Sequence, residues 1–358
     1  MKNKWVKGTA LVMALAVVLT VVFAGCSSGS EKLYIFAYGD YFDPDIVDMF
    51  EDEYGIEVVY EEYAAPEDMY AKATSGANDY DLICASDYII EKMLQEDLLL
   101  PIDFANVPNF ANIGDTYKEM SKSFDPELQY SVPHFWGTVG ILYDRTKVSD
   151  EDVQSWSVLF DERFADQIIM PNSERDAMLP ALKVLGYDLN TTNTAELDEA
   201  ANMLIEQKSL VQAYLLDEAA RTKVSSGNAA MAVIYNGEAY LAFEENENVA
   251  YAVPQEGTNI WMDSWVIPNT CQHKESAEKF LDFMCREDIA AMNFDYIYYS
   301  TPNQAVYDSL DADVQSEKAI FPDQSVIDNS SVFKYLGSDT EKYYTCLLYT
   351  SPSPRDTE

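Results

Sequence analysis

Apolar residues of this chain fall into short runs, separated by stretches in which they recur every three or four positions. The short runs predict buried strands, and the spaced stretches predict helices with one face toward a core. In the first part of the chain the two patterns alternate, with strands expected at 33–37, 56–60 and 80–84 and helices at 44–54, 66–73 and 86–94. This order predicts a mostly parallel sheet covered by helices.

A second succession of the same kind follows the segment Phe135-Trp136-Gly137. Strands are expected at 168–170 and 229–235, and helices at 174–185 and 194–208. A chain of 358 residues is also long enough for two domains. The sequence therefore predicts an α/β protein of two lobes.

The N-terminus has the anatomy of an export signal, with three lysines before an apolar run over 10–24. The run is shorter than the roughly 20 residues that a membrane-spanning helix needs. Phe23-Ala24-Gly25-Cys26 resembles the lipobox of bacterial lipoproteins. We therefore expect residues 1–25 to be a lipoprotein signal peptide and Cys26 to carry a lipid that anchors the protein on the outer face of the bacterial cytoplasmic membrane. An uncleaved signal anchor is the alternative, and it leaves the chain on the same side.

Acidic residues far outnumber basic ones, with 62 Asp and Glu against 23 Lys and Arg and a formal charge of -39. Nucleic-acid binding is excluded as the main function, because phosphates are attracted to basic surfaces. The same charge favours cationic partners, although it is equally expected of a surface that only keeps a protein soluble.

Four cysteines follow the signal, and none has the spacing of a zinc site. Cys84, Cys271, Cys285 and Cys346 stand far apart, without a CxxC motif. A disulfide among Cys84, Cys271 and Cys285 and buried free thiols both agree with this spacing. No metal and no cofactor is predicted.

The most informative positions come directly after the predicted strands, because ligands of open α/β sheets bind beyond the carboxyl ends of strands. Four of these loops pair an aromatic residue with an acid, and a fifth adds a tyrosine. The candidates are Tyr38, Asp40, Tyr41, Ser86, Tyr88, Tyr235, Glu238, Trp261, Asp263 and Tyr299. A lone pair of this kind is more often a helix cap beside a core aromatic, but four at equivalent positions indicate a shared site.

Carboxylates combined with aromatic rings suit a cationic ligand. Removing water from an ammonium group is costly, and the cost is recovered only when a carboxylate meets it with good geometry. Aromatic faces attract a cation by roughly 0.5–2 kcal/mol and also pack on methylene groups. A ligand with an apolar chain and an amine at each end needs carboxylates at both ends and rings between them. That chemistry describes a polyamine.

The same segments resemble a known family, the spermidine/putrescine-binding proteins of bacterial ABC importers. The resemblance covers about 33–344, with motifs that include 34–41, Tyr80-Asp81-Leu82-Ile83, Trp261-Met262-Asp263-Ser264 and Thr301-Pro302-Asn303. It implies a periplasmic-binding-protein-like fold, whose two lobes are joined by hinge strands, close over a polyamine and then dock on a membrane permease. It implies a transport component rather than an enzyme.

The resemblance also implies that each lobe is discontinuous in sequence. Lobe 1 would comprise residues 31–137 with 262–305, and lobe 2 residues 138–261 with 306–345. Residues 346–358 lie beyond the resemblance and contain two prolines, which end a helix. This stretch is similar to translated sequencing-adapter sequence, and we expect it to be non-native.

Positions that match the family's motifs receive ligand roles by resemblance. Asp40 with Tyr41 would meet one end of the ligand, Asp263 would stand at the central wall, and Asp176 takes the place of a distal Glu. Ser86 stands beside them at the end of a predicted strand. The aromatic box would consist of Tyr38, Tyr88, Tyr235, Trp261 and Tyr299, with Tyr in place of Trp at the first and third of these positions.

Three departures concern the choice of polyamine. Ser173 stands where spermidine binders carry an acid, and Phe333 stands where a Gln is expected. Glu238 falls where putrescine-specific relatives place an acid. The resemblance therefore implies a polyamine without deciding between putrescine and spermidine.

Two other classes stay open. An exported glycosidase also uses paired carboxylates and aromatic platforms, and Asp40 with Asp263 would be the pair. The chain has only two histidines and lacks the common hydrolase motifs, which disfavours an enzyme. A binding protein of the same fold for a sugar, an amino acid or ferric ion is the nearer alternative. Tyr298, Tyr299 and Asp263 would suit ferric ion. An amino acid needs an Arg for its carboxylate, and these loops offer only Arg175, which is more typical of a surface or hinge ion pair.

Overall fold

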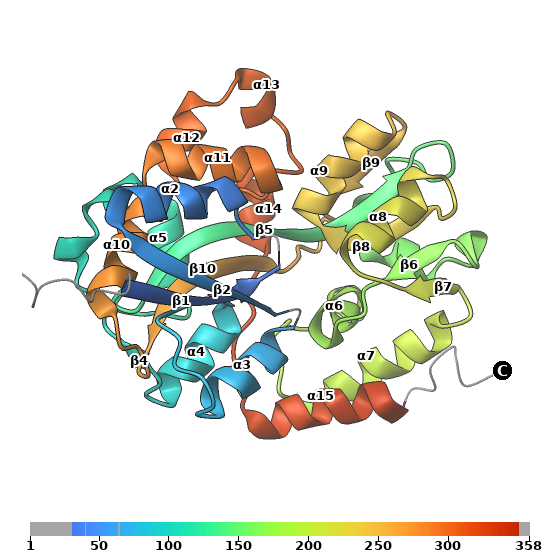
Figure 1. Ribbon diagram of the computed structural model, residues 1–358. Coiled ribbons are helices and arrows are strands. Elements are labelled where there is room, and N and C mark those ends of the chain that lie inside the picture. Colours follow the sequence, from blue (N-terminus) through green and yellow to red (C-terminus); the bar gives the residue numbers. More distant parts are fainter. Residues whose placement is uncertain (1–30, 40, 64, 351–358) are drawn as a thin grey trace, which may run out of the picture.

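The computed structural model describes residues 31–39, 41–63 and 65–350, which form two α/β halves side by side (Figure 1). The strands are β1 (Glu31–Tyr38), β2 (Ile56–Tyr63), β3 (Leu82–Ser86), β4 (Leu99–Leu100), β5 (Ser131–Asp144), β6 (Ile168–Met170), β7 (Val211–Tyr214), β8 (Met231–Tyr235), β9 (Val249–Ala252) and β10 (Ile260–Pro268).

The helices alternate with these strands, as the hydrophobic pattern predicts. They are α2 (Pro44–Tyr54), α3 (Pro66–Thr74), α4 (Asp87–Gln95), α5 (Asp115–Ser121), α6 (Glu174–Leu185), α7 (Thr194–Gln207), α8 (Asp217–Ser225), α9 (Asn236–Glu245), α10 (Lys274–Met284), α11 (Glu287–Ile297), α12 (Gln304–Ser309), α13 (Ala312–Gln315), α14 (Gln324–Asn329) and α15 (Ser338–Thr350). Short 3-10 turns cover Phe104–Asn106, Pro108–Asn112, Asp152–Gln154, Trp156–Phe160 and Glu162–Phe164.

The described strands follow the order β2-β1-β3-β10-β5-β8-β6-β7, with β4 beside β10 and β9 beside β5. β1 pairs in parallel with β2 and β3, and β6 pairs in parallel with β7 and β8. β10 and β5 run antiparallel to their neighbours between these two parallel groups. The predicted α/β class with a mostly parallel sheet in each half is confirmed, and the two central strands are its antiparallel exception.

β5 is the strand that connects the two halves, and all of its 14 residues are buried. Residues 131–138 pair with β10, and residues 139–143 pair with β8. Gly137 lies next to the position where the pairing partner of β5 changes from β10 to β8. A Cβ atom there would come within 1.9 Å of the Asn236 amide oxygen and 2.6 Å of the Trp261 ring. Only glycine lets these side chains cross so close to the strand.

Apolar helix faces pack against the sheet at the predicted spacing. Ile46 and Phe50 of α2 are fully buried. The Phe50 ring centroid lies 5.1 Å from that of Phe280 and 5.5 Å from that of Phe283, both on α10. Edge-on aromatic contacts of this kind strengthen a core beyond the area that they bury.

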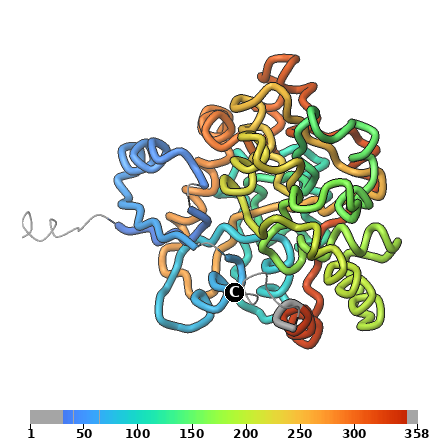
Figure 2. The backbone as a smooth tube through the Cα atoms, turned by 90° about the vertical axis from the view of Figure 1, so that its right-hand side faces the viewer, coloured from blue at the N-terminus to red at the C-terminus, as the bar shows by residue number. Residues whose placement is uncertain are grey.

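The division into two discontinuous lobes stays a prediction. The segment 306–345, which was expected to belong to lobe 2, contacts elements of both halves. Val306, Ile320 and Phe321 share an apolar cluster with Ala290 and Phe294, so the stretch 306–321 lies with elements assigned to lobe 1. By contrast, α15 lies along α6 and α7 of the other half, as Figures 1 and 2 show. The C-terminal segment therefore contacts both halves.

Several expectations concern the ends and the cysteines. Residues 1–25 and Cys26 lie outside the described residues, as do residues 351–358 of the expected tail, while residues 346–350 continue α15. Cys84, Cys271 and Cys285 are free thiols, so the disulfide alternative is not realised. Within the described part of the chain, no helix is both long and apolar enough to cross a membrane.

Candidate ligand-binding site

Five of the expected aromatic residues meet where the strand ends of both halves face each other. Tyr38 ends β1, Tyr235 ends β8, and Trp261 lies near the start of β10. The Trp261 ring centroid is 6.0 Å from that of Tyr235 and 5.0 Å from that of Tyr299. Tyr41 lies 5.0 Å from Tyr38 and 6.3 Å from Tyr299. We call these five residues the aromatic cluster.

Tyr299 owes its place in the cluster to two local features. Tyr298, the residue before it, ends α11 in the left-handed conformation with φ 59°, which turns the chain away from the helix axis. The ring of Tyr299 then packs on Gly237, where a Cβ atom would come within 2.2 Å of it. Tyr298 itself contacts Tyr240, with ring centroids 5.1 Å apart, and lies outside the aromatic cluster.

Asp263 is the central carboxylate of the cluster, and its side chain is 7% exposed. A register shift between Asp263 and Ser264 interrupts the β10–β5 pairing, and such irregularities re-aim a side chain. The hydroxyl of Tyr41 donates a hydrogen bond to it. Burial raises the pKa of Asp263 to about 7. Among the described residues no Lys or Arg forms an ion pair with this carboxylate.

A second carboxylate, Asp87, directly follows Ser86, the residue paired with Asp263 between β3 and β10, and is 1% exposed. Its Oδ2 accepts a hydrogen bond from the backbone N–H of Met262 at 3.2 Å. Burial raises the pKa of Asp87 well above its ordinary value, and the charge of Asp263 adds to the effect. In the sequence, Asp87 is the acid that accompanies Tyr88 after the third predicted strand and also a candidate helix cap, but it received no ligand role of its own.

Asp176 occupies the opposite side of the cluster, at the start of α6. The hydroxyl of Tyr235 donates to its Oδ2 at 2.7 Å, and burial raises the pKa of this carboxyl. Three buried polar atoms of the site lack a hydrogen bond of good geometry: Ser86 Oγ, Asp176 Oδ1 and Trp261 Nε1. Buried polar groups are nearly always paired in folded proteins, so these atoms indicate a place for a polar ligand.

The two remaining described candidates are engaged with other side chains. Tyr88 donates its hydroxyl to Glu67 at 3.0 Å. Glu238 forms an ion pair with Arg221, whose Nε also binds Glu245 at 3.0 Å. Glu67 and Arg221 escaped sequence reasoning, since no local pattern connects them to the strand ends. Asp40 lies outside the described residues, so its role stays a prediction.

Arg175 contacts Phe333, which is one of the departures from the expected pattern. The Arg175 guanidinium carbon lies 4.2 Å from the Phe333 ring centroid. Its nitrogens donate to the carbonyl oxygens of Leu189 and Lys334 at 3.2 Å. The alternative in which Arg175 receives an amino-acid carboxylate is disfavoured, because these contacts hold its charged group against the backbone.

His134 lies beside the cluster, under Tyr41. Its ring is buried, which lowers its pKa to about 3, and Nε2 lies 3.2 Å from the carbonyl oxygen of Tyr41. A small hollow adjoins it and is lined in part by Phe135, Trp265 and Asn293. His134 is therefore a neutral packing residue. Within the described residues, no His, Cys, Asp and Glu side chains are grouped so as to hold a metal ion.

The fold and the cluster together define a class of protein. Two α/β halves joined by shared central strands, with polar and aromatic side chains converging at the crossing, form a solute-binding protein of the periplasmic type. The chain belongs to the family of bacterial extracellular solute-binding proteins, whose sequence profile matches residues 45–322.

Relatives and solved structures agree with this assignment. The spermidine/putrescine-binding periplasmic protein of Escherichia coli is 31% identical over 346 residues, which cover 96% of this chain and 98% of that protein. The substrate-binding protein PotD of a Streptococcus pneumoniae spermidine/putrescine ABC transporter superposes with a TM-score of 0.79 at 35% identity, covering 90% of this chain and 98% of that one. The Tp0655 lipoprotein of Treponema pallidum superposes with a TM-score of 0.79 at 25% identity, covering 90% and 99%.

Proposed function

We propose that this protein captures a polyamine, putrescine or spermidine, outside the cytoplasm and delivers it to an ABC permease. The observation that carries the proposal is Asp263, a buried carboxylate surrounded by aromatic rings and without a basic partner among the described residues. An ammonium group supplies the missing countercharge, and the rings of the cluster cover the methylene chain beside it.

Similar proteins support the same ligand class. The relative from Escherichia coli is named for spermidine and putrescine, and a Pseudomonas aeruginosa relative, 26% identical over 349 residues, is named for putrescine. A neutral sugar is disfavoured, because it would leave Asp263 and Asp176 buried without countercharge. Ferric ion is disfavoured because Tyr298, one of its expected ligands, faces Tyr240 instead.

A lipid on Cys26 is part of the proposal. The signal-like N-terminus ends in this cysteine, and the related Treponema pallidum protein is described as a lipoprotein. Such an anchor would keep the binding protein close to its permease. Mass spectrometry of the membrane-extracted protein tests it, since a diacylglyceryl group adds a defined mass that Cys26→Ala abolishes.

Thermal unfolding of the protein with a panel of amines tests the ligand class. Putrescine, spermidine and spermine are each titrated, and 1,4-butanediol is the matched control because it has the carbon chain of putrescine without charge. We expect the unfolding midpoint to rise with polyamine concentration, since a ligand that binds only the folded state stabilises it. Equal shifts with the diol, or no shift with any amine, would contradict the proposal. Incubation with oligosaccharides that yielded products would favour the glycosidase instead.

A further inference from the structure

Helices α8 and α9 of the second half lie beside each other (Figure 1), and Gly237 in the first turn of α9 packs on Tyr299 of the aromatic cluster. Asp217 begins α8 just beyond β7, and Glu238 lies in the first turn of α9, just beyond β8. Both acids therefore follow the carboxyl ends of strands, where solutes bind in folds of this type.

Glu238 is bound by a fixed cation. Its side chain is 15% exposed, and the side chain of its partner Arg221 is 13% exposed. Arg221 reaches from α8 and is held a second time through its Nε–H, which donates to Glu245 at 3.0 Å. An ion pair shielded from water to this degree is only weakly screened. The guanidinium is thus a permanent positive charge in this wall.

This charge lies next to the expected ligand position. Gly237, the neighbour of Glu238, is in contact with the ring of Tyr299. Burial raises the pKa of the Tyr299 hydroxyl, and the negative charges of Asp217, Glu238 and Asp263 act in the same direction. Arg221 acts in the opposite direction. The hydroxyl of Tyr299 therefore stands within the field of all four charged groups.

Asp217 differs from Glu238 in having no countercharge. Among the described residues its carboxylate makes no hydrogen bond and no ion pair, and the residue is exposed. Its backbone is left-handed, with φ 48°, a conformation that costs free energy in a residue other than glycine. The neighbouring Asp176 leaves its buried Oδ1 unpaired. Asp217 and Asp176 are thus available to an ammonium, whereas Glu238 is already paired.

We propose that Arg221 is a specificity-determining residue: a resident cation that neutralises Glu238 and repels an additional ammonium, which shifts selectivity from triamines toward diamines. This inference rests on the proposed polyamine binding. A triamine carries more charge than a diamine, so a positive group in the wall disfavours it more strongly. Removal of Arg221 frees the Glu238 carboxylate and adds a negative charge to the wall.

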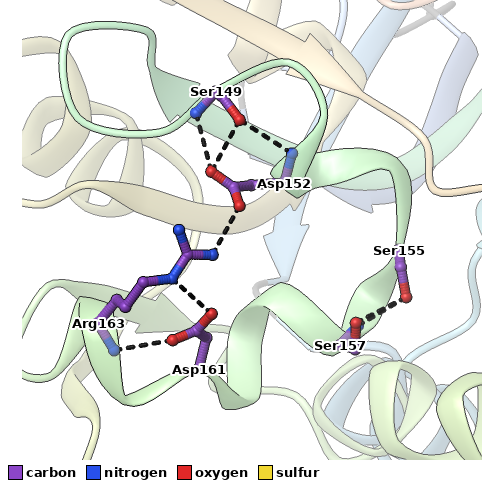
Figure 3. A network of polar contacts seen from close by, with 6 residues as sticks. All are labelled: Ser149, Asp152, Ser155, Ser157, Asp161 and Arg163. Carbon is purple, nitrogen blue, oxygen red and sulfur yellow. Dashed lines mark hydrogen bonds and ion pairs between the residues drawn. The ribbon is translucent and has the colours of Figure 1, made fainter.

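Calorimetric titration of the whole protein with putrescine and with spermidine tests the inference. We expect Arg221→Gln to raise the ratio of spermidine affinity to putrescine affinity by about tenfold. Arg163→Gln is the matched control, because it removes the same charge from the exposed network of Asp152 and Asp161 shown in Figure 3. A ratio that changes no more in Arg221→Gln than in Arg163→Gln overturns the inference.

Two further variants distinguish an effect of charge from an effect of misfolding. Arg221→Lys keeps the charge and should keep the ratio of the unaltered protein. Arg221→Gln/Glu238→Gln removes both charges. Its ratio of spermidine affinity to putrescine affinity should be close to that of the unaltered protein, even if the single variant folds poorly. A double variant that keeps a raised ratio contradicts the role of Glu238. If the unaltered protein binds neither amine, the proposed function itself fails, whereas binding with an unmoved ratio refutes only the role of Arg221.

Discussion

The two sides of the aromatic cluster are both acidic, but they differ in whether a basic side chain pairs with the carboxylate. On the side of β1 and β10, Asp263 is buried, and within the described part of the chain its side chain has one hydrogen-bond partner, the hydroxyl of Tyr41. On the side of α8 and α9, Glu238 is matched by Arg221. Among the described residues, the buried carboxylate of the first side, Asp263, has no countercharge, whereas Glu238 of the second side has one and the exposed Asp217 has none.

This difference predicts which contacts matter most for binding. An ionised carboxylate in an apolar wall is unfavourable until a cation arrives, so the ligand's ammonium gains most where the protein supplies no positive group. Where an arginine is already present, the ligand replaces an existing interaction and gains less. Substitutions should therefore rank by how little compensation each acid receives from the protein.

Asp263→Asn should have the largest effect. We expect it to weaken putrescine binding by about 100-fold, and by tenfold at the least, because it leaves a buried ammonium without its carboxylate. The ligand-free melting temperature should fall by no more than a few degrees, since the substitution removes a charge that burial disfavours. Calorimetric titration and thermal unfolding measure the two quantities.

Asp115→Asn is the matched control for Asp263→Asn. It makes the same chemical change on a side chain that is fully exposed at the start of α5. Its putrescine affinity should equal that of the unaltered protein. An unchanged affinity in Asp263→Asn would show that this residue does not contact the ligand. The proposed difference between the two sides of the aromatic cluster would then be wrong.

Acidification should have the next largest effect. The folded pKa of Asp263 is about 7, above its ordinary value, so the carboxyl is mostly ionised at pH 8 and mostly protonated at pH 6. Both amines of putrescine stay charged over this range. Since the ammonium binds the ionised form, affinity should fall about tenfold from pH 8 to pH 6, and binding at pH 6 should release a proton.

The same pKa shift determines whether the stability of the ligand-free protein rises or falls with pH. A carboxyl whose pKa is raised by folding binds its proton more tightly in the folded state, so the ligand-free protein should lose stability as pH rises from about 4 to 7. Asp263→Asn should remove most of both pH dependences. A pH profile of affinity that is identical in the variant and the unaltered protein would assign the titration to another group.

Much of the fold could be predicted because its signals are local. The strand expected at 168–170 is β6, and the helix expected at 174–185 is α6, with bounds that coincide. Their apolar runs and spacing are complete within a few residues. β7 escaped prediction because its sequence, VQAY, alternates weakly and all four of its residues are only half-buried. With that strand missing, the loop that carries Asp217 could not be recognised as a strand end.

The site was predictable only as far as strand ends indicate it. Tyr38, Tyr235, Trp261 and Asp263 were expected from their places beside strands. The pairing of Arg221 with Glu238 could not be predicted from the sequence, since the two residues are 17 positions apart on separate helices and meet only through packing. Countercharge is a property of the folded arrangement, and the comparison between the two sides therefore required the structure.

Asp176→Asn should have a moderate effect, smaller than that of Asp263→Asn. Burial raises the pKa of Asp176, while hydrogen bonds from Tyr235 and Ser173 and the charge of Arg175 lower it. Among the residues that the structure describes, no basic group acts on the pKa of Asp263. We expect putrescine affinity to fall by about fivefold in calorimetric titration. Asp198→Asn, on the exposed side of α7, is the control. A loss larger than that of Asp263→Asn would reverse the ranking of the two sides.

Tyr88→Phe should have the smallest effect. The hydroxyl of Tyr88 is used within the protein, where it donates to Glu67 at 3.0 Å, and the ring remains in the variant to cover the ligand's methylene groups. Removing a hydrogen bond of this kind costs about 1 kcal/mol of stability, but it changes binding only through a small shift of the ring. Putrescine affinity should therefore change by less than about threefold in the same titration. A tenfold loss would mean that the Tyr88 hydroxyl contacts the ligand and that its pairing with Glu67 exists only in the unliganded protein.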